Sequence, residues 1–94
     1  MDYSREAVIL STTEEREQVS IYPNPTTEAF VVYNPARGSD REVTILGLDG
    51  RVLHQALLKG GESLSYQPSE IGIYLVRVVS GSGKQEKTYK VFKQ

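Results

Sequence analysis

The side chains that could perform chemistry are few in this chain of 94 residues, and they are scattered. The single histidine, His54, has no nucleophile or second metal ligand at a useful spacing, which is typical of a surface histidine. Glu14, Glu15 and Glu17 could bind a metal, but Arg16 stands among them, and the stretch is typical of a solvated linker. No serine occupies a Gly-x-Ser-x-Gly turn, and the absence of cysteine excludes thiol catalysis, zinc knuckles and disulfides. We therefore expect no catalytic residue, no metal and no cofactor, and the sequence predicts a domain that is not an enzyme.

The C-terminal end is the stretch whose composition indicates binding. Between residues 84 and 93 it interleaves lysines with aromatic residues, and only Glu86 opposes the lysines, which leaves a net charge of +3. Two interpretations remain open from composition alone. The lysines could guard an edge strand against aggregation, or they could form a docking surface. Nucleic acid and anionic membrane are not favoured as partners, because the whole chain has a net charge of only -1.

The C-terminal end must be positioned by short β-strands, because most of the remaining sequence consists of β-type runs separated by turn residues. Alternating, β-branched or aromatic stretches are bounded by Pro, Gly, Asn and Asp, and no window shows a sustained helical period. The expected strands are residues 19–22, 30–33, 42–48, 51–58, 62–66, 73–79 and 85–92. The pattern predicts an all-β fold, an immunoglobulin-like β-sandwich of about seven antiparallel strands, formed by one domain at residues 19–94.

Turn residues and side-chain alternation give more specific expectations for several of these strands. Asp49-Gly50 predicts a hairpin between the third and fourth strands, and the Gly81-Ser82-Gly83 stretch predicts a turn before the last one. Val43 and Ile45 share one face of their strand. In residues 73–79, Tyr74, Val76 and Val78 share a face, and Arg77 lies on the other. The first face is therefore expected to point into the core.

The first 18 residues differ from the rest. Residues 11–18 contain no apolar side chain and are acidic, which favours a linker over the alternative of one helical turn. The apolar run at residues 7–10 could be the last strand of an upstream domain or an edge strand of this one. The N-terminus has no signal-peptide pattern, and no apolar run approaches the roughly 20 residues that span a bilayer. We therefore expect residues 1–18 to be an upstream remnant and linker, and the chain to be part of a longer precursor.

Four segments resemble, in order, the motifs of one family. They are an apolar-Tyr-Pro-Asn-Pro-Thr stretch at residues 21–26, a central hairpin at 43–52, a Gly-x-Tyr strand at 72–78, and a closing Lys-apolar-apolar-Lys at 90–93. Over about residues 19–93 the chain resembles the type A C-terminal sorting domain of the type IX secretion system, or Por secretion tail, of Bacteroidetes. We expect a structural role for the signature residues Tyr22, Pro23, Asn24, Pro25, Asp49, Gly50, Gly72 and Tyr74. In particular, we expect the Asn24 side chain to bond local backbone at a tight strand exit.

The chain departs from the family pattern at three places. Glu28 stands where glycine is usual, and Gly47 stands where an Asp or Asn is common. Ser69-Glu70 replaces the usual Leu-Pro before the Gly-x-Tyr strand. These departures affect the expected local packing rather than the resemblance itself.

The resemblance implies a secretion signal rather than an enzyme. It implies an attached upstream cargo domain, transit through the periplasm, and recognition by outer-membrane type IX translocon proteins. It also implies cleavage by a sortase-like cysteine peptidase and a final location at the outer membrane and cell surface, or secreted. Because a protease needs an extended exposed segment, cleavage is expected around Ser11, Thr12, Thr13, Glu14 and Glu15. The resemblance favours docking for the last strand, and the expected translocon-recognition residues are Lys84, Lys87, Tyr89, Lys90, Val91, Phe92 and Lys93.

Other interpretations remain. The domain could be an immunoglobulin-like binding or spacer module of a surface protein, which carries no signal. It could also be an uncleaved sorting domain in a component of the secretion apparatus. Exposed edge strands make self-association conceivable in each case.

Overall fold

The computed structural model describes residues 18–80 and 85–94, and these residues form strands and connections without a helix. The predicted all-β class is confirmed. The strands are β1 (Ser20–Tyr22), β2 (Phe30–Tyr33), β3 (Arg41–Gly47), β4 (Val52–Leu58), β5 (Ser63–Tyr66), β6 (Gly72–Ser80) and β7 (Glu86–Lys93). Each predicted strand is present, with bounds within one or two residues of the expected ones.

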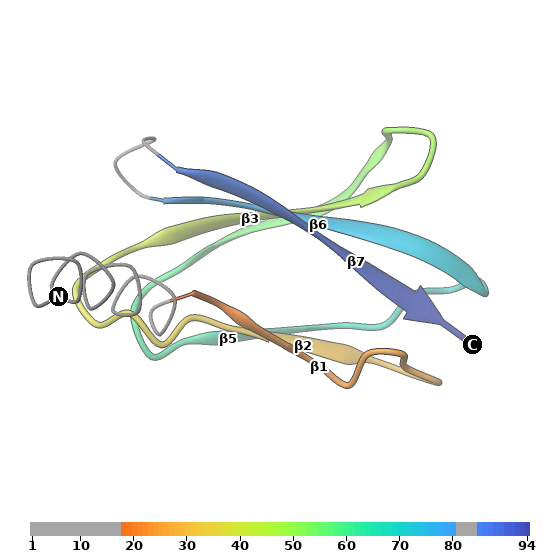
Figure 1. Cartoon of the computed structure of the whole chain (residues 1–94), viewed down its shortest axis with the longest axis horizontal. Coiled ribbons are helices and arrows are strands. Elements are labelled where there is room, and N and C mark those ends of the chain that lie inside the picture. The colour runs from red at the N-terminus through yellow and green to blue at the C-terminus, as the bar shows by residue number, and fades with distance from the viewer. Residues whose placement is uncertain (1–17, 81–84) are drawn as a thin grey trace, which may run out of the picture.

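The strands form two sheets that pack as a sandwich (Figure 1). One sheet has the order β1-β2-β5 and the other has the order β4-β3-β6-β7, and every strand pair is antiparallel. This is the immunoglobulin arrangement in which the fourth strand joins the sheet of the third, sixth and seventh. β7 is therefore an edge strand of the larger sheet.

Alternation along the strands builds the core. In β6, Tyr74, Val76 and Val78 are buried while Arg77 points outward, as predicted. Phe30 of β2 is fully buried, and its ring lies 5.9 Å from that of Tyr66 on β5. The buried apolar cluster is drawn from both sheets and comprises Val19, Phe30, Val32, Val43, Ile45, Leu58, Val76, Val78 and Val91. Burial of this set supplies the main driving force for folding.

The central strand β3 is more buried than its alternation predicts. Val43 and Ile45 face the core as expected, but Thr44 and Leu46 on the opposite face are also buried. Side chains of the flanking strands cover them, and the Gln55 side-chain amide donates a hydrogen bond of 3.3 Å to the Thr44 hydroxyl. The outer face of this sheet is therefore only partly solvated.

Several expectations fall outside the described residues. They include the run at residues 7–10, the linker up to residue 17, the Gly81–Gly83 turn and Lys84. Within the described part of the chain, no helix has the length and apolar character needed to cross a membrane.

Candidate functional site

β7 carries the predicted recognition residues on two different faces. It pairs with β6 alone among the described strands, with Val91 opposite Tyr74 and Tyr89 opposite Val76. Because side chains alternate along a strand, Lys87, Tyr89, Val91 and Lys93 lie on the face toward the other sheet. The remaining side chains, those of Glu86, Thr88, Lys90 and Phe92, lie on the outer face.

The accessibility of these residues is uneven. Lys87 and Lys90 are exposed, and Phe92 retains 45% of its surface. Tyr89 and Lys93 are half-buried. Val91 is fully buried in the core, so its side chain contributes packing in the folded domain and offers no contact surface. The surface that β7 can present to a partner is therefore formed by its lysines and by Phe92.

Local contacts set the electrostatics of the strand. The Lys87 ammonium donates a 3.0 Å hydrogen bond to the Gln18 side chain and lies 5.7 Å from the centre of the Tyr89 ring. Burial raises the pKa of the Tyr89 phenol above its ordinary value, and the nearby charge of Arg41 partly opposes this rise. The Glu86 carboxylate lies 3.9 Å from Arg77 on the neighbouring strand, in an exposed and weak ion pair. Glu86 thus has a cation beside it on its own sheet, while the exposed Lys87 and Lys90 give the strand positive charge on both of its faces.

The Tyr-Pro-Asn-Pro-Thr stretch lies against β7. The Asn24 side-chain amide donates to the Lys90 carbonyl oxygen at 2.9 Å, and its oxygen Oδ1 accepts from the Phe92 N–H at 3.0 Å. The prediction that the Asn24 side chain bonds local backbone is therefore wrong. Its partners are 66 and 68 positions away, and the fold alone brings them together. The peptide bonds that precede Pro23 and Pro25 are both cis.

Thr26 continues this contact through its main chain. The Thr26 N–H donates to the Phe92 carbonyl oxygen, and the Gln94 N–H donates to the Thr26 carbonyl oxygen, each at 2.8 Å. The Lys93 ammonium adds a 3.0 Å hydrogen bond to the carbonyl oxygen of Thr27. We call residues 24–27, with their hydrogen bonds to β7 and Gln94, the clasp. It joins the first signature motif to the C-terminal end of the chain, and both lie at the same end of the molecule (Figure 1).

Thr26 is a structural residue that sequence reasoning missed. Its side chain is almost fully buried, and its hydroxyl donates to the Ala29 carbonyl oxygen at 2.8 Å and accepts from the Glu28 N–H at 3.2 Å. A threonine two residues before an expected glycine was the available signal, because Ser and Thr hydroxyls commonly close such turns. Glu28 fits here without a positive φ, since among the described residues only glycines have one.

The other signature residues lie in the β3–β4 connection and at the start of β6. Asp49 and Gly50 form the predicted hairpin connection, in which Asp49 Oδ1 accepts from the Arg51 N–H at 3.0 Å and Gly50 has a φ of +86°. The connection spans residues 48–51, and the register between β3 and β4 shifts at a β-bulge beside it, at Ile45/Leu46, so the connection is longer than a two-residue turn.

Tyr74 has a role that the sequence analysis did not identify. Its hydroxyl donates at 2.7 Å to the carbonyl oxygen of Glu70, which lies four residues upstream in the connection before β6. This is the tyrosine corner of immunoglobulin-like sandwiches, in which a tyrosine ties the strand to the preceding connection. Because the bond goes to main chain, replacement of Leu-Pro by Ser69-Glu70 leaves it intact. The Gly-x-Tyr spacing after a Pro-containing connection was the signal that could have revealed it.

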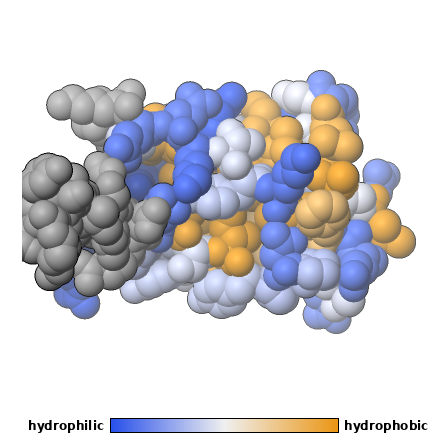
Figure 2. Space-filling view, viewed as in Figure 1, coloured by the Kyte–Doolittle hydropathy of each residue, from blue (hydrophilic) through white to orange (hydrophobic). Residues whose placement is uncertain are grey.

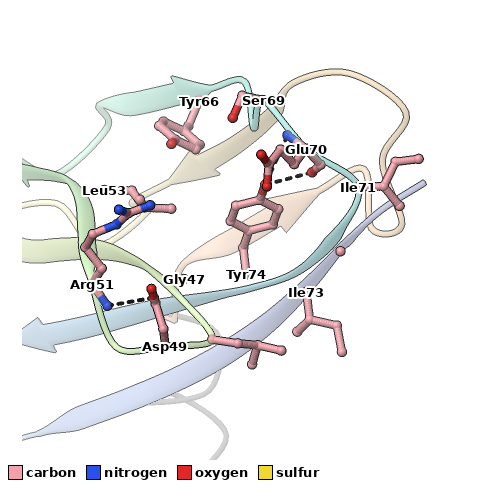
Figure 3. A pocket seen from close by; sticks show the side chains of 12 residues that line it. Gly47, Asp49, Arg51, Leu53, Tyr66, Ser69, Glu70, Ile71, Ile73 and Tyr74 are labelled. Carbon is pink, nitrogen blue, oxygen red and sulfur yellow. Dashed lines mark hydrogen bonds between the residues drawn. The ribbon is translucent and has the colours of Figure 1, made fainter.

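A cavity of about 340 Å³ opens between these two motifs (Figure 3). The β3–β4 turn lines it with Asp49 and Arg51, and the β5–β6 connection lines it with Ser69 and Glu70. Tyr74 closes one side, and its hydrogen bond to Glu70 is drawn in Figure 3. The Asp49 carboxylate and the Tyr74 hydroxyl both bond main-chain groups of the lining, and the structure assigns the cavity no chemistry.

His54 is exposed, as expected for a surface histidine. Its ring lies 5.8 Å from that of Tyr66 on β5. Within residues 18–80 and 85–94, no three His, Cys, Asp or Glu side chains come together in a group that could hold a metal ion. The contact with Tyr66 places the His54 ring beside an aromatic residue of the other sheet.

Comparison with known proteins identifies the family. Residues 20–93 match the model of the family described as "Secretion system C-terminal sorting domain". The chain belongs to this family. The matched range begins at the first residue of β1 and ends at the last residue of β7, so it covers both sheets and the clasp. No curated protein and no solved structure gave a match.

Membership defines the role of the domain at a coarse level. The family comprises sorting domains of the type IX secretion system, and the chain is a C-terminal sorting signal of that system. Such a domain is attached to cargo in the same precursor and directs it across the outer membrane, to the surface or the medium. The family is not an enzymatic one.

Proposed function

We propose that residues 19–94 direct an upstream cargo protein through the outer-membrane translocon, and that the translocon reads the domain through β7. The observation that carries this proposal is the position of Lys87 and Lys90 on an edge strand, with both side chains exposed. A folded signal must be read from its surface, and an edge strand offers backbone groups as well as side chains. The charges orient the approach of a partner and accelerate encounter.

The proposed recognition set is narrower than the sequence prediction. Lys87, Lys90, Phe92 and Lys93 offer surface to a partner, while Val91 and Tyr89 support the strand from within. Phe92 lies opposite Ile73, and Figure 2 shows apolar residues gathered toward the end of the molecule where the C-terminus lies. Lys84 remains part of the proposal on charge alone.

We further propose that the cargo crosses the periplasm before export and is released from the domain afterwards. Cleavage by a sortase-like cysteine peptidase would fall in the acidic stretch at residues 11–15, which precedes the packed strands. Such an enzyme needs an extended, exposed substrate and cannot bind a strand that is packed in a sheet. The matched family range begins after this stretch, which supports a cut that spares the domain.

The experiment is a secretion assay with charge-reversed variants. A periplasm-directed folded reporter is fused upstream of residues 1–94 and expressed in a bacterium that has a type IX system. Lys87→Glu with Lys90→Glu is expected to strand the reporter in the periplasm, while Lys59→Glu, an exposed lysine outside β7, is expected to be exported normally. Equal export of both variants would contradict recognition through β7.

The second candidate is a sorting domain that stays uncleaved, because family membership does not distinguish it from a cleaved one. Mass spectrometry of the exported reporter separates the two. A new C-terminus within residues 11–18 supports cleavage, and an intact chain supports a domain that stays attached.

A further inference from the structure

The outer edge of β7 is divided into two halves. The N–H and carbonyl of Phe92 both point away from β6, since Asn24 and Thr26 bond them from the other side, and the Lys90 carbonyl points the same way. Along an antiparallel strand the outward-facing backbone groups recur at every second residue. The outward groups of β7 therefore belong to Glu86, Thr88, Lys90 and Phe92.

The clasp occupies the C-terminal half of this edge. It bonds the carbonyl of Lys90, both backbone groups of Phe92 and the N–H of Gln94. Thr26 and Lys93 form a parallel β-bridge, so the clasp acts as a one-residue strand. A partner strand cannot pair with β7 beyond Lys90 unless the clasp opens.

The N-terminal half of the edge is open within the described part of the chain. No described strand or bridge pairs with the outer side of β7 from Glu86 to Thr88. Unpaired edge backbone is a template for strand addition, and proteins guard it with lysines unless they use it. Lys87 projects from one face of this half, and Lys90, where the clasp begins, projects from the other face of β7, so an added strand would pass between two positive charges.

We infer that an extended strand of a translocon protein adds to β7 along Glu86–Lys90, with acidic side chains facing Lys87 and Lys90, and that Asn24 ends the pairing. This inference rests on the proposed function. It defines which part of β7 the partner recognises, and it specifies that recognition occurs by strand pairing. We infer an acidic partner strand from charge complementarity with Lys87 and Lys90. Glu86, the acid of β7, already lies beside Arg77. Backbone pairing supplies affinity, and the lysines supply orientation.

Proline at Thr88 tests the pairing without breaking the sheet. The Thr88 N–H points away from β6, so Thr88→Pro removes an outward donor and no ladder hydrogen bond, and edge strands tolerate proline at such positions. Thr88→Val is the matched control, since it changes the side chain and keeps the donor. In the reporter assay we expect Thr88→Pro to lower the exported fraction about tenfold, the effect of losing one or two intermolecular hydrogen bonds, and Thr88→Val to leave it unchanged.

The fold of each variant is checked by circular dichroism and thermal unfolding of the isolated chain. If Thr88→Pro does not fold, Glu86→Pro replaces it, because Glu86 begins the strand and its N–H also points outward. Glu86→Ala is then the control for loss of the carboxylate. A folded proline variant that is exported as well as its control overturns the inference.

Two other results are distinguishable from that one. If the unaltered fusion is not exported, the proposed function fails before the pairing is reached. If sedimentation shows a dimer of the isolated chain that Thr88→Pro dissociates while export stays normal, β7 pairs with a second copy. That result also overturns the inference that a strand of a translocon protein pairs with β7.

Discussion

Asn24→Ala is the change that most directly tests the link between the first signature motif and the last strand. It removes two hydrogen bonds that join the loop after β1 to Lys90 and Phe92. Asn24 is exposed, so water can replace its side chain, and each bond is worth about 0.5–1 kcal/mol, at the lower end of the usual range. We expect a loss of about 1–2 kcal/mol, or about 5–15 °C in melting temperature for a domain of this size.

Hydrogen exchange followed by NMR locates the effect. The Phe92 amide, which bonds Asn24 Oδ1, should exchange faster in Asn24→Ala, while the amide of the central-strand residue Ile45 should change only with global stability. Thr27→Ala is the matched control, because Thr27 contributes only its carbonyl oxygen to the clasp and the variant keeps that group. If Asn24→Ala and Thr27→Ala have equal stability and equal exchange at Phe92, the clasp does not hold the C-terminal end.

Three further substitutions test the hydrogen bonds of Asn34 and Tyr74 and the titration of Tyr89. Asn34→Ala leaves the Ala36 N–H and the Ser39 and Leu58 carbonyls without their buried partner, and chemical denaturation should show a loss of about 3–5 kcal/mol, against little change in Ser39→Ala. Tyr74→Phe removes the tyrosine corner and should lower the melting temperature by about 4–8 °C, and an unchanged melting temperature would show that the bond is dispensable. Because burial raises the pKa of Tyr89, the folded chain holds that proton more tightly than the unfolded chain. This contribution is complete below the unfolded pKa of about 10 and is lost as pH rises through the folded value. Stability measured by denaturation should therefore fall more steeply at alkaline pH in the native chain than in Tyr89→Phe, and parallel profiles would refute the assignment.

The strands could be predicted because their signals are local. Alternation places Val76 and Val78 in the core and Arg77 outside, and the Asp49-Gly50 pair marks a turn wherever it stands between such runs. These patterns need no knowledge of what lies across the sandwich. The same locality explains why the four-residue length of that turn was missed, since the bulge beyond it depends on pairing between β3 and β4.

The contacts of the candidate site could not be predicted in the same way. Asn24 bonds a strand 66 residues away, and only the closed sandwich brings the two together. Val91 was grouped with the surface lysines because the stretch is basic overall, yet strand alternation turns it into the core. The division of the β7 edge follows from both facts, and neither is visible in composition.

Export of a reporter is the measurement that tests the central claim most directly. A folded reporter with an N-terminal signal peptide is fused upstream of residues 1–94 and produced in type IX-competent cells and in cells that lack the outer-membrane translocon. The account predicts reporter at the surface or in the medium of competent cells only, and retention in the periplasm when β7 carries Lys87→Glu and Lys90→Glu. Retention of the unaltered fusion in competent cells, or export without the translocon, would contradict it.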